Sequence, residues 1–107
     1  MSDIAIVYAV YADAESAQAA AHMAIERELA ACANILAPCT SVYRWQGEVT
    51  QGAEVPVLFK TTRARRDALM AALALGHGYE IPAILSWDAD AVHLPFAGWV
   101  EQQTRGH

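Results

Sequence analysis

The chain has 107 residues, of which 55% are hydrophobic and 18% are charged, and its formal net charge is −5. This length and composition are typical of one folded domain with one core, and they exclude a disordered segment. The acidic balance argues against nucleic-acid binding, because that affinity depends on Lys and Arg side chains that neutralise phosphates. We therefore expect residues 1–107 to form a single domain without a nucleic-acid partner.

Two further features concern the compartment. No apolar run is long enough to span a bilayer, and the first residues lack the basic and apolar pattern of a signal peptide. The two cysteines, Cys32 and Cys39, are too few for a disulfide framework and lack the CxxC spacing of a zinc or redox site. We expect a cytoplasmic protein with reduced thiols and no membrane partner.

The first third of the chain predicts a strand followed by a helix. Residues 4–11 form a short apolar run rich in β-branched and aromatic side chains, as in a strand covered on both faces. Asp13 fits a helix N-cap, and apolar residues then return every three or four positions to about Ala31.

The middle of the chain predicts a long β-hairpin. Polar and apolar residues alternate from Asn34 to Thr50, residues 50–53 read as the turn, and residues 54–61 form the returning arm. Pro38 and Pro56 lack the N–H donor that a β-ladder needs, so we expect a bulge or unpaired ends at these positions.

The last third predicts a helix, a strand and another helix. Thr62 can cap a helix over residues 64–75 that ends at Gly76, a strand covers residues 81–86, and a short helix holds Phe96, Trp99 and Val100. The complete order, βαββαβ with an added helix, is typical of an α+β ferredoxin-like fold: an antiparallel sheet with two helices on one face.

The length of the hairpin suggests assembly. An arm from Asn34 to Thr50 would extend roughly 55 Å, against about 35 Å for a domain of this size. It must bend at Pro38 or project, and a projecting edge that carries Tyr43 and Trp45 would aggregate unless another chain covers it. The alternative is a bent arm folded over its own core.

Chemistry-bearing residues are few. The loop Gly76–Glu80 brings the imidazole of His77 near a phenol and a carboxylate, which together could supply ligands for a metal ion. The alternative is a helix stop with Tyr79 packed on the sheet. Lys60 with Glu80 or His77 could form an acid–base group, but no spacing requires it, so we expect no enzyme.

A group of arginines opens the second predicted helix. Arg63, Arg65 and Arg66 stand where positive charge opposes the helix dipole, so they could serve an anionic ligand or form a solvated patch.

Four segments resemble the CutA divalent-cation-tolerance family: residues 29–35 (LAACANI), 40–48 (TSVYRWQGE), 59–62 (FKTT) and 77–82 (HGYEIP). The resemblance implies a ferredoxin-like fold, a homotrimer held by long strands, an architecture similar to that of the PII signalling proteins, and a role in tolerance of copper or another divalent cation. By position, the proposed copper ligands of the family fall on Ala9, Gly76 and His77, of which only His77 has a metal-binding side chain.

The resemblance leads to two functional hypotheses. The first is a non-enzymatic CutA-like homotrimer in the response to Cu²⁺ or other divalent cations, with ligand-binding residues Lys60, Tyr79 and Glu80, and His77 as a metal ligand. The second is a PII-like signalling or structural trimer in which metal binding is incidental.

Overall fold

The computed structural model describes residues 2–105, and its elements follow the predicted order with the first hairpin arm divided in two. The elements are β1 (Ile4–Tyr11), α1 (Ala14–Glu26), β2 (Cys32–Ile35), β3 (Cys39–Trp45), β4 (Glu48–Thr62), α2 (Arg63–Gly76), β5 (Ile84–Asp88) and α3 (Leu94–Gln103).

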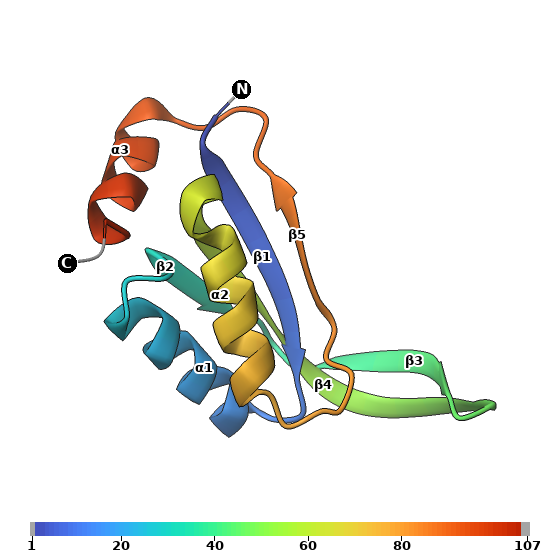
Figure 1. Cartoon of the computed structure of the whole chain (residues 1–107). Helices are drawn as coiled ribbons and strands as arrows, with labels where there is room; N and C mark the ends of the chain where they lie inside the picture. Colours follow the sequence, from blue (N-terminus) through green and yellow to red (C-terminus); the bar gives the residue numbers. More distant parts are fainter. Residues whose placement is uncertain (1, 106–107) are drawn as a thin grey trace.

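The strands form an antiparallel sheet in the order β2-β4-β1-β5, and β3 pairs with the distal part of β4. Val7 lies opposite Phe59 of β4 on one side and Ser86 of β5 on the other. Helices α1 and α2 cover the same face of this sheet (Figure 1). The predicted α+β ferredoxin-like fold is thus confirmed, including the additional C-terminal helix.

The core lies between the sheet and these two helices. Odd-numbered residues of β1 and β4 point to this face, where Val7 and Phe59 pack with Leu69 and Leu73 of α2 and with the small residues of α1. A second cluster places Val100 of α3 against Ile4 at the end of the sheet. The opposite face, which carries the even-numbered residues of β1 and β4, is left without a helical layer over most of its length.

The edge of the hairpin contains the expected bulge. Residue pairing runs from Ile35↔Val57 to Cys39↔Glu54, so three residues of the edge arm lie opposite two residues of β4. Pro56 lies within β4 opposite Val10, and its carbonyl accepts a hydrogen bond from the N–H of Leu36 at 2.9 Å. Beyond this bulge the β3–β4 end projects away from the rest of the sheet (Figure 1).

The predicted turn at residues 50–53 is wrong. Trp45 pairs with Glu48, so the turn is the two-residue loop Gln46–Gly47, with φ angles of 50° and 85°. Both residues in the left-handed region identify the mirror-image turn whose twist matches that of paired strands. Gly52, within the predicted turn, lies in β4 opposite Ser41.

Two other boundaries differ from the prediction. Helix α1 ends at Glu26 rather than near Ala31, because Glu28 adopts a φ of 56° and turns the backbone, while Leu29 still packs in the core. Strand β5 covers Ile84–Asp88 rather than residues 81–86. The predicted N-caps are both present: Asp13 accepts from the N–H of Ser16 at 2.8 Å, and Thr62 accepts from that of Arg65 at 3.2 Å.

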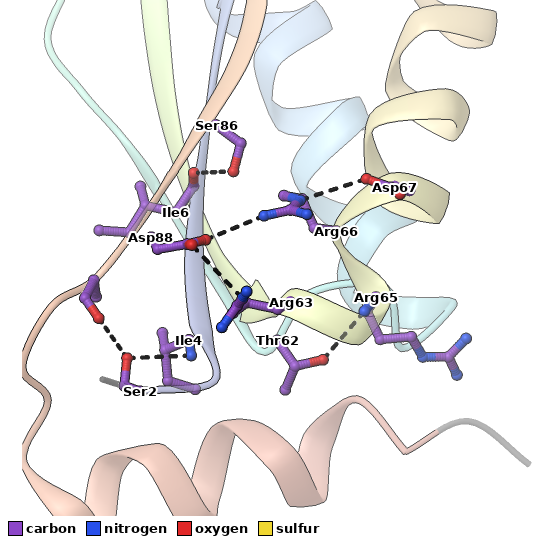
Figure 2. A network of polar contacts seen from close by, with 11 residues as sticks. Ser2, Ile4, Ile6, Thr62, Arg63, Arg65, Arg66, Asp67, Ser86 and Asp88 are labelled. Atoms are coloured by element: carbon purple, nitrogen blue, oxygen red, sulfur yellow. Dashed lines mark hydrogen bonds and ion pairs between the residues drawn. The ribbon is translucent and has the colours of Figure 1, made fainter.

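The arginines at the start of α2 have structural partners (Figure 2). Arg63 and Arg66 form ion pairs with Asp88 of β5 at 3.6 and 3.1 Å, which ties the helix to the sheet edge. Arg65 donates from Nε to the carbonyl of Thr104 at 2.7 Å, at the end of α3. Each arginine thus has a protein acceptor, which favours neither an anion site nor a purely solvated patch.

Candidate ligand-binding groove

A groove of about 530 Å³ lies between the projecting hairpin and the loop that joins α2 to β5. The hairpin contributes side chains from β3 and β4, and the loop contributes the rest: Ser41, Tyr43, Trp45, Glu54, Gly78, Tyr79, Glu80, Ile81 and Ala83. Ser41, Tyr43 and Trp45 alternate along β3, so all three reach the same face of the hairpin.

Tyr79 connects the two sides of the groove. Its hydroxyl donates to Oε2 of Glu54 at 2.8 Å, across 25 residues of sequence. Burial is the largest cause that raises the pKa of Tyr79 to about 12, followed by the hydrogen bond to Glu54 and by negative charge nearby. Tyr79 therefore stays protonated at neutral pH and holds the Glu54 carboxylate at the groove wall.

His77 anchors the loop to the end of β1. A carbonyl can only accept a hydrogen bond and an amide can only donate one, so His77 donates from Nε2 to the Val10 carbonyl at 2.7 Å and accepts at Nδ1 from the N–H of Tyr79 at 3.0 Å. Its ring stacks on Tyr11 with a centroid distance of 4.6 Å and an interplanar angle of 17°. Both nitrogens of this neutral imidazole are thus engaged.

The ring of Tyr11 stacks on that imidazole. It is buried, and its hydroxyl oxygen has no hydrogen-bond partner among the residues that the structure describes. Burial raises the pKa of Tyr11 to about 12.

Lys60 lies outside the groove. It pairs with Ile6 and Cys32, and its ammonium group donates to Oδ1 of Asn34. It lies six positions along extended β4 from Glu54, which corresponds to about 20 Å. The structure thus brings Tyr79 and Glu80 to one groove, places His77 behind it, and leaves Lys60 outside it.

The donor set at the proposed copper position of this chain does not fit a metal ion. Ala9 is buried in the core and Gly76 ends α2, so neither supplies a ligand, and each nitrogen of His77 is already hydrogen-bonded. Among residues 2–105, no three His, Cys, Asp or Glu side chains lie close enough to hold a metal ion. Cys32 and Cys39 are free thiols.

Comparison with known proteins identifies the family. The family model described as "CutA1 divalent ion tolerance protein" matches residues 5–103, almost the whole chain. The chain belongs to the CutA family. The resemblance of its four sequence segments to this family is thereby confirmed.

Similar proteins come from distant organisms. The Divalent-cation tolerance protein CutA of Thermus thermophilus is 34% identical over 90 residues, which are 84% of this chain and 87% of that protein. Protein CutA 1, chloroplastic, of Oryza sativa is 31% identical over 100 residues, 94% of this chain and 56% of that protein. This CutA-family chain spans about half the length of the first curated relatives that it matches.

The fold agrees with solved CutA structures. The divalent ion tolerance protein CutA1 from Ehrlichia chaffeensis superimposes with a TM-score of 0.92 at 31% identity, over 97% of each chain. No helix within the described part of this CutA-family chain is long and apolar enough to cross a membrane.

Proposed function

We propose that this CutA-family chain acts as a non-enzymatic homotrimer in the cellular response to divalent cations. The family name supports the link to divalent cations. The observation that carries the proposal of assembly is the apolar, helix-free face of the sheet.

That face has the composition of an interface. Ile6 and Tyr8 of β1 lie opposite Trp87 and Leu85 of β5, and Leu58 of β4 continues the row. Leu85 and Trp87 are 50% and 46% exposed in the single subunit. A contiguous apolar face of this kind is rare on a free monomer, and a second copy of the same chain would cover it.

The projecting hairpin supports the same assembly. Val42 and Val49, on its side away from the groove, are about two-thirds exposed. An uncovered strand edge with exposed valines favours pairing with another chain. A closed trimer would use the sheet face and the hairpin end together.

For the ligand sites we propose Tyr79 and Glu80 as groove-lining residues, with Lys60 reaching a ligand only across a subunit boundary. His77 would bind Cu²⁺ or another divalent cation only after giving up one of its two hydrogen bonds. We propose the cytoplasm as the compartment of this chain, which its two free thiols support. The rice relative is named as chloroplastic.

Metal titration of the full chain tests the role of His77. If His77 is a ligand, the His77→Ala variant will bind Cu²⁺ and Zn²⁺ at least tenfold more weakly than the wild type. His22→Ala removes an exposed histidine of α1 and is the matched control. Equal affinity of the wild type and His77→Ala would remove His77 from any metal site.

A second candidate function is a PII-like signalling or structural trimer with incidental metal binding. The engagement of both His77 nitrogens favours it, because the imidazole then orients the loop instead of a metal. Thermal-shift measurements with nucleotides and metal ions separate the candidates. Stabilisation by a nucleotide with no response to metals would support the second candidate, and the reverse would support the first.

A further inference from the structure

The projecting hairpin, residues 39–54, leaves the sheet at a sharply defined junction. β1 pairs with β4 as far as Tyr11↔Val55, and the pairing of β3 with β4 begins at the neighbouring residue, Glu54. Among the described residues, the part of β4 that belongs to the hairpin pairs with β3 alone. A two-stranded hairpin is at best marginally stable in water, so its junction with the sheet needs support.

The β-ladder is interrupted at this same junction. The bulge sets three residues of the edge arm against two of β4, and one of those two is Pro56, which has no N–H to donate. Its carbonyl still accepts from the N–H of Leu36 at 2.9 Å. The backbone thus joins the hairpin to the sheet by fewer hydrogen bonds than a regular ladder would provide.

The loop between α2 and β5, residues 77–83, crosses the junction and is fastened on both sides of it (Figure 1). On the side of the sheet, His77 donates to the carbonyl of Val10, near the end of β1, at 2.7 Å. On the side of the hairpin, the Tyr79 hydroxyl donates to Glu54 at 2.8 Å. The loop therefore connects the last turns of the sheet to the first residue pair of the hairpin.

The two fastening points are braced against each other. Only one residue separates them, and the N–H of Tyr79 donates to Nδ1 of His77 at 3.0 Å. The imidazole also stacks on the ring of Tyr11, which is buried in the core. A displacement of the hairpin at Glu54 is thus resisted through Tyr79 and His77 by the packed end of β1.

The hairpin has few other side-chain hydrogen bonds. Among residues 2–105, one joins Cys39 to Ser41 and another runs from Arg44 to the carbonyl of Gly47, and both lie within the hairpin. The hydrogen bond from Tyr79 is the one that connects a hairpin side chain to the rest of the described chain.

We propose that residues 77–83 form a strap that restrains the hairpin at its junction with the sheet, with His77 as the sheet end and Tyr79 as the hairpin end. The proposal concerns contacts within one chain. It requires neither a bound metal ion nor the proposed trimer.

Hydrogen exchange followed by mass spectrometry tests the proposal on the full chain, in buffer that contains EDTA to exclude metal ions. In Tyr79→Phe we expect the amides of residues 39–54 to exchange about fivefold faster than in the wild type, while those of β1 keep their rates. Tyr43→Phe is the matched control, because it removes a hydroxyl from the hairpin and not from the strap. It should leave all rates unchanged.

Variants at the other end show whether the two ends act together. His77→Ala should accelerate exchange in the hairpin as much as Tyr79→Phe does, although His77 contacts the sheet and not the hairpin. The double variant should exchange no faster than either single variant, because release of either end already frees the strap. His77→Gln retains an N–H donor for the Val10 carbonyl and should restore part of the protection.

Two results would overturn the proposal. Unchanged exchange of the hairpin in a folded Tyr79→Phe variant would mean that other contacts hold it. Additive effects of Tyr79→Phe and His77→Ala would mean that the two residues act separately and form no strap. Light scattering on the same samples measures the mass of the assembly independently, so failure of the proposed trimer is distinguishable from failure of the strap.

Discussion

Tyr11 and Tyr79 both contact the ring of His77, and their hydroxyl groups have opposite surroundings. The Tyr79 hydroxyl donates to Glu54, whereas that of Tyr11 is buried with no partner among the described residues. A buried polar group without a partner costs about 1–3 kcal/mol. The same residue type thus stabilises the fold at one position and is a liability at the other.

Tyr11→Phe tests the cost of the unpaired hydroxyl. The substitution keeps the ring that stacks on His77 and removes only the oxygen, so we expect the free energy of unfolding to rise by about 1 kcal/mol. Urea denaturation at a fixed protein concentration measures the change. A decrease of similar size would show that the Tyr11 hydroxyl has a partner after all.

Glu54→Gln tests the link across the groove. Because a neutral amide no longer disfavours the phenolate, we expect the pKa of Tyr79 to fall from about 12 toward its ordinary value of 10. It should not fall the whole way, since burial is the larger cause of the shift. NMR titration of labelled tyrosine rings measures this, and Glu48→Gln should leave the value unchanged.

The raised pKa of Tyr79 also predicts how the stability of the fold depends on pH. A phenol whose folded-state pKa is about 12 and whose unfolded value is 10 keeps its proton in the folded state after the unfolded chain has lost it. The contribution of Tyr79 to stability is therefore complete below pH 10 and is lost as the pH rises to about 12. In Glu54→Gln the loss should end at a lower pH.

At the scale of elements, side-chain periodicity predicted the type of each element better than its end. The alternation along the hairpin and the caps Asp13 and Thr62 were predicted correctly, because each is a local signal. The turn was predicted at residues 50–53, whereas it lies at Gln46 and Gly47, where Gln46 adopts a positive φ despite its side chain. The end of α1 was predicted too late because Glu28, and not a glycine, adopts the positive φ that turns the chain.

A pair of glycine substitutions tests the position of the turn. Gly47 has a φ of 85°, which strains any residue with a Cβ, so Gly47→Ala should lower the free energy of unfolding by about 1 kcal/mol. Gly52→Ala meets no atom within 4 Å and no such strain, so it should be neutral or slightly stabilising. Urea denaturation of both variants decides; the opposite order of stability would return the turn to residues 50–53.

At the scale of the whole molecule, the candidate site was only partly accessible from the sequence. Tyr79 and Glu80 were identified from their motif, but Glu54 was not, because its contact with Tyr79 depends on how the α2–β5 loop folds over the hairpin. The prediction that Tyr43 and Trp45 take part in assembly stays a prediction; their place in the groove was not predicted, since alternation gives a face and not the partner of that face. Lys60 was grouped with the loop by motif, although β4 holds it about 20 Å away.

The apolar sheet face makes a distinct prediction about assembly. Trp87→Glu places a charge in the proposed interface and should yield a smaller species at micromolar concentration. Leu75→Glu is the control, because Leu75 is 91% exposed on α2, in the layer on the opposite side of the sheet. Equal masses for both variants, measured by light scattering, would mean that Trp87 lies outside any interface.

The mass of the wild-type protein in solution tests the account most directly. Light scattering at micromolar concentration should give about three times 11.6 kDa, because the helix-free sheet face and the projecting hairpin each need a second copy to cover them. A stable monomer of 11.6 kDa under the same conditions would contradict the proposed assembly.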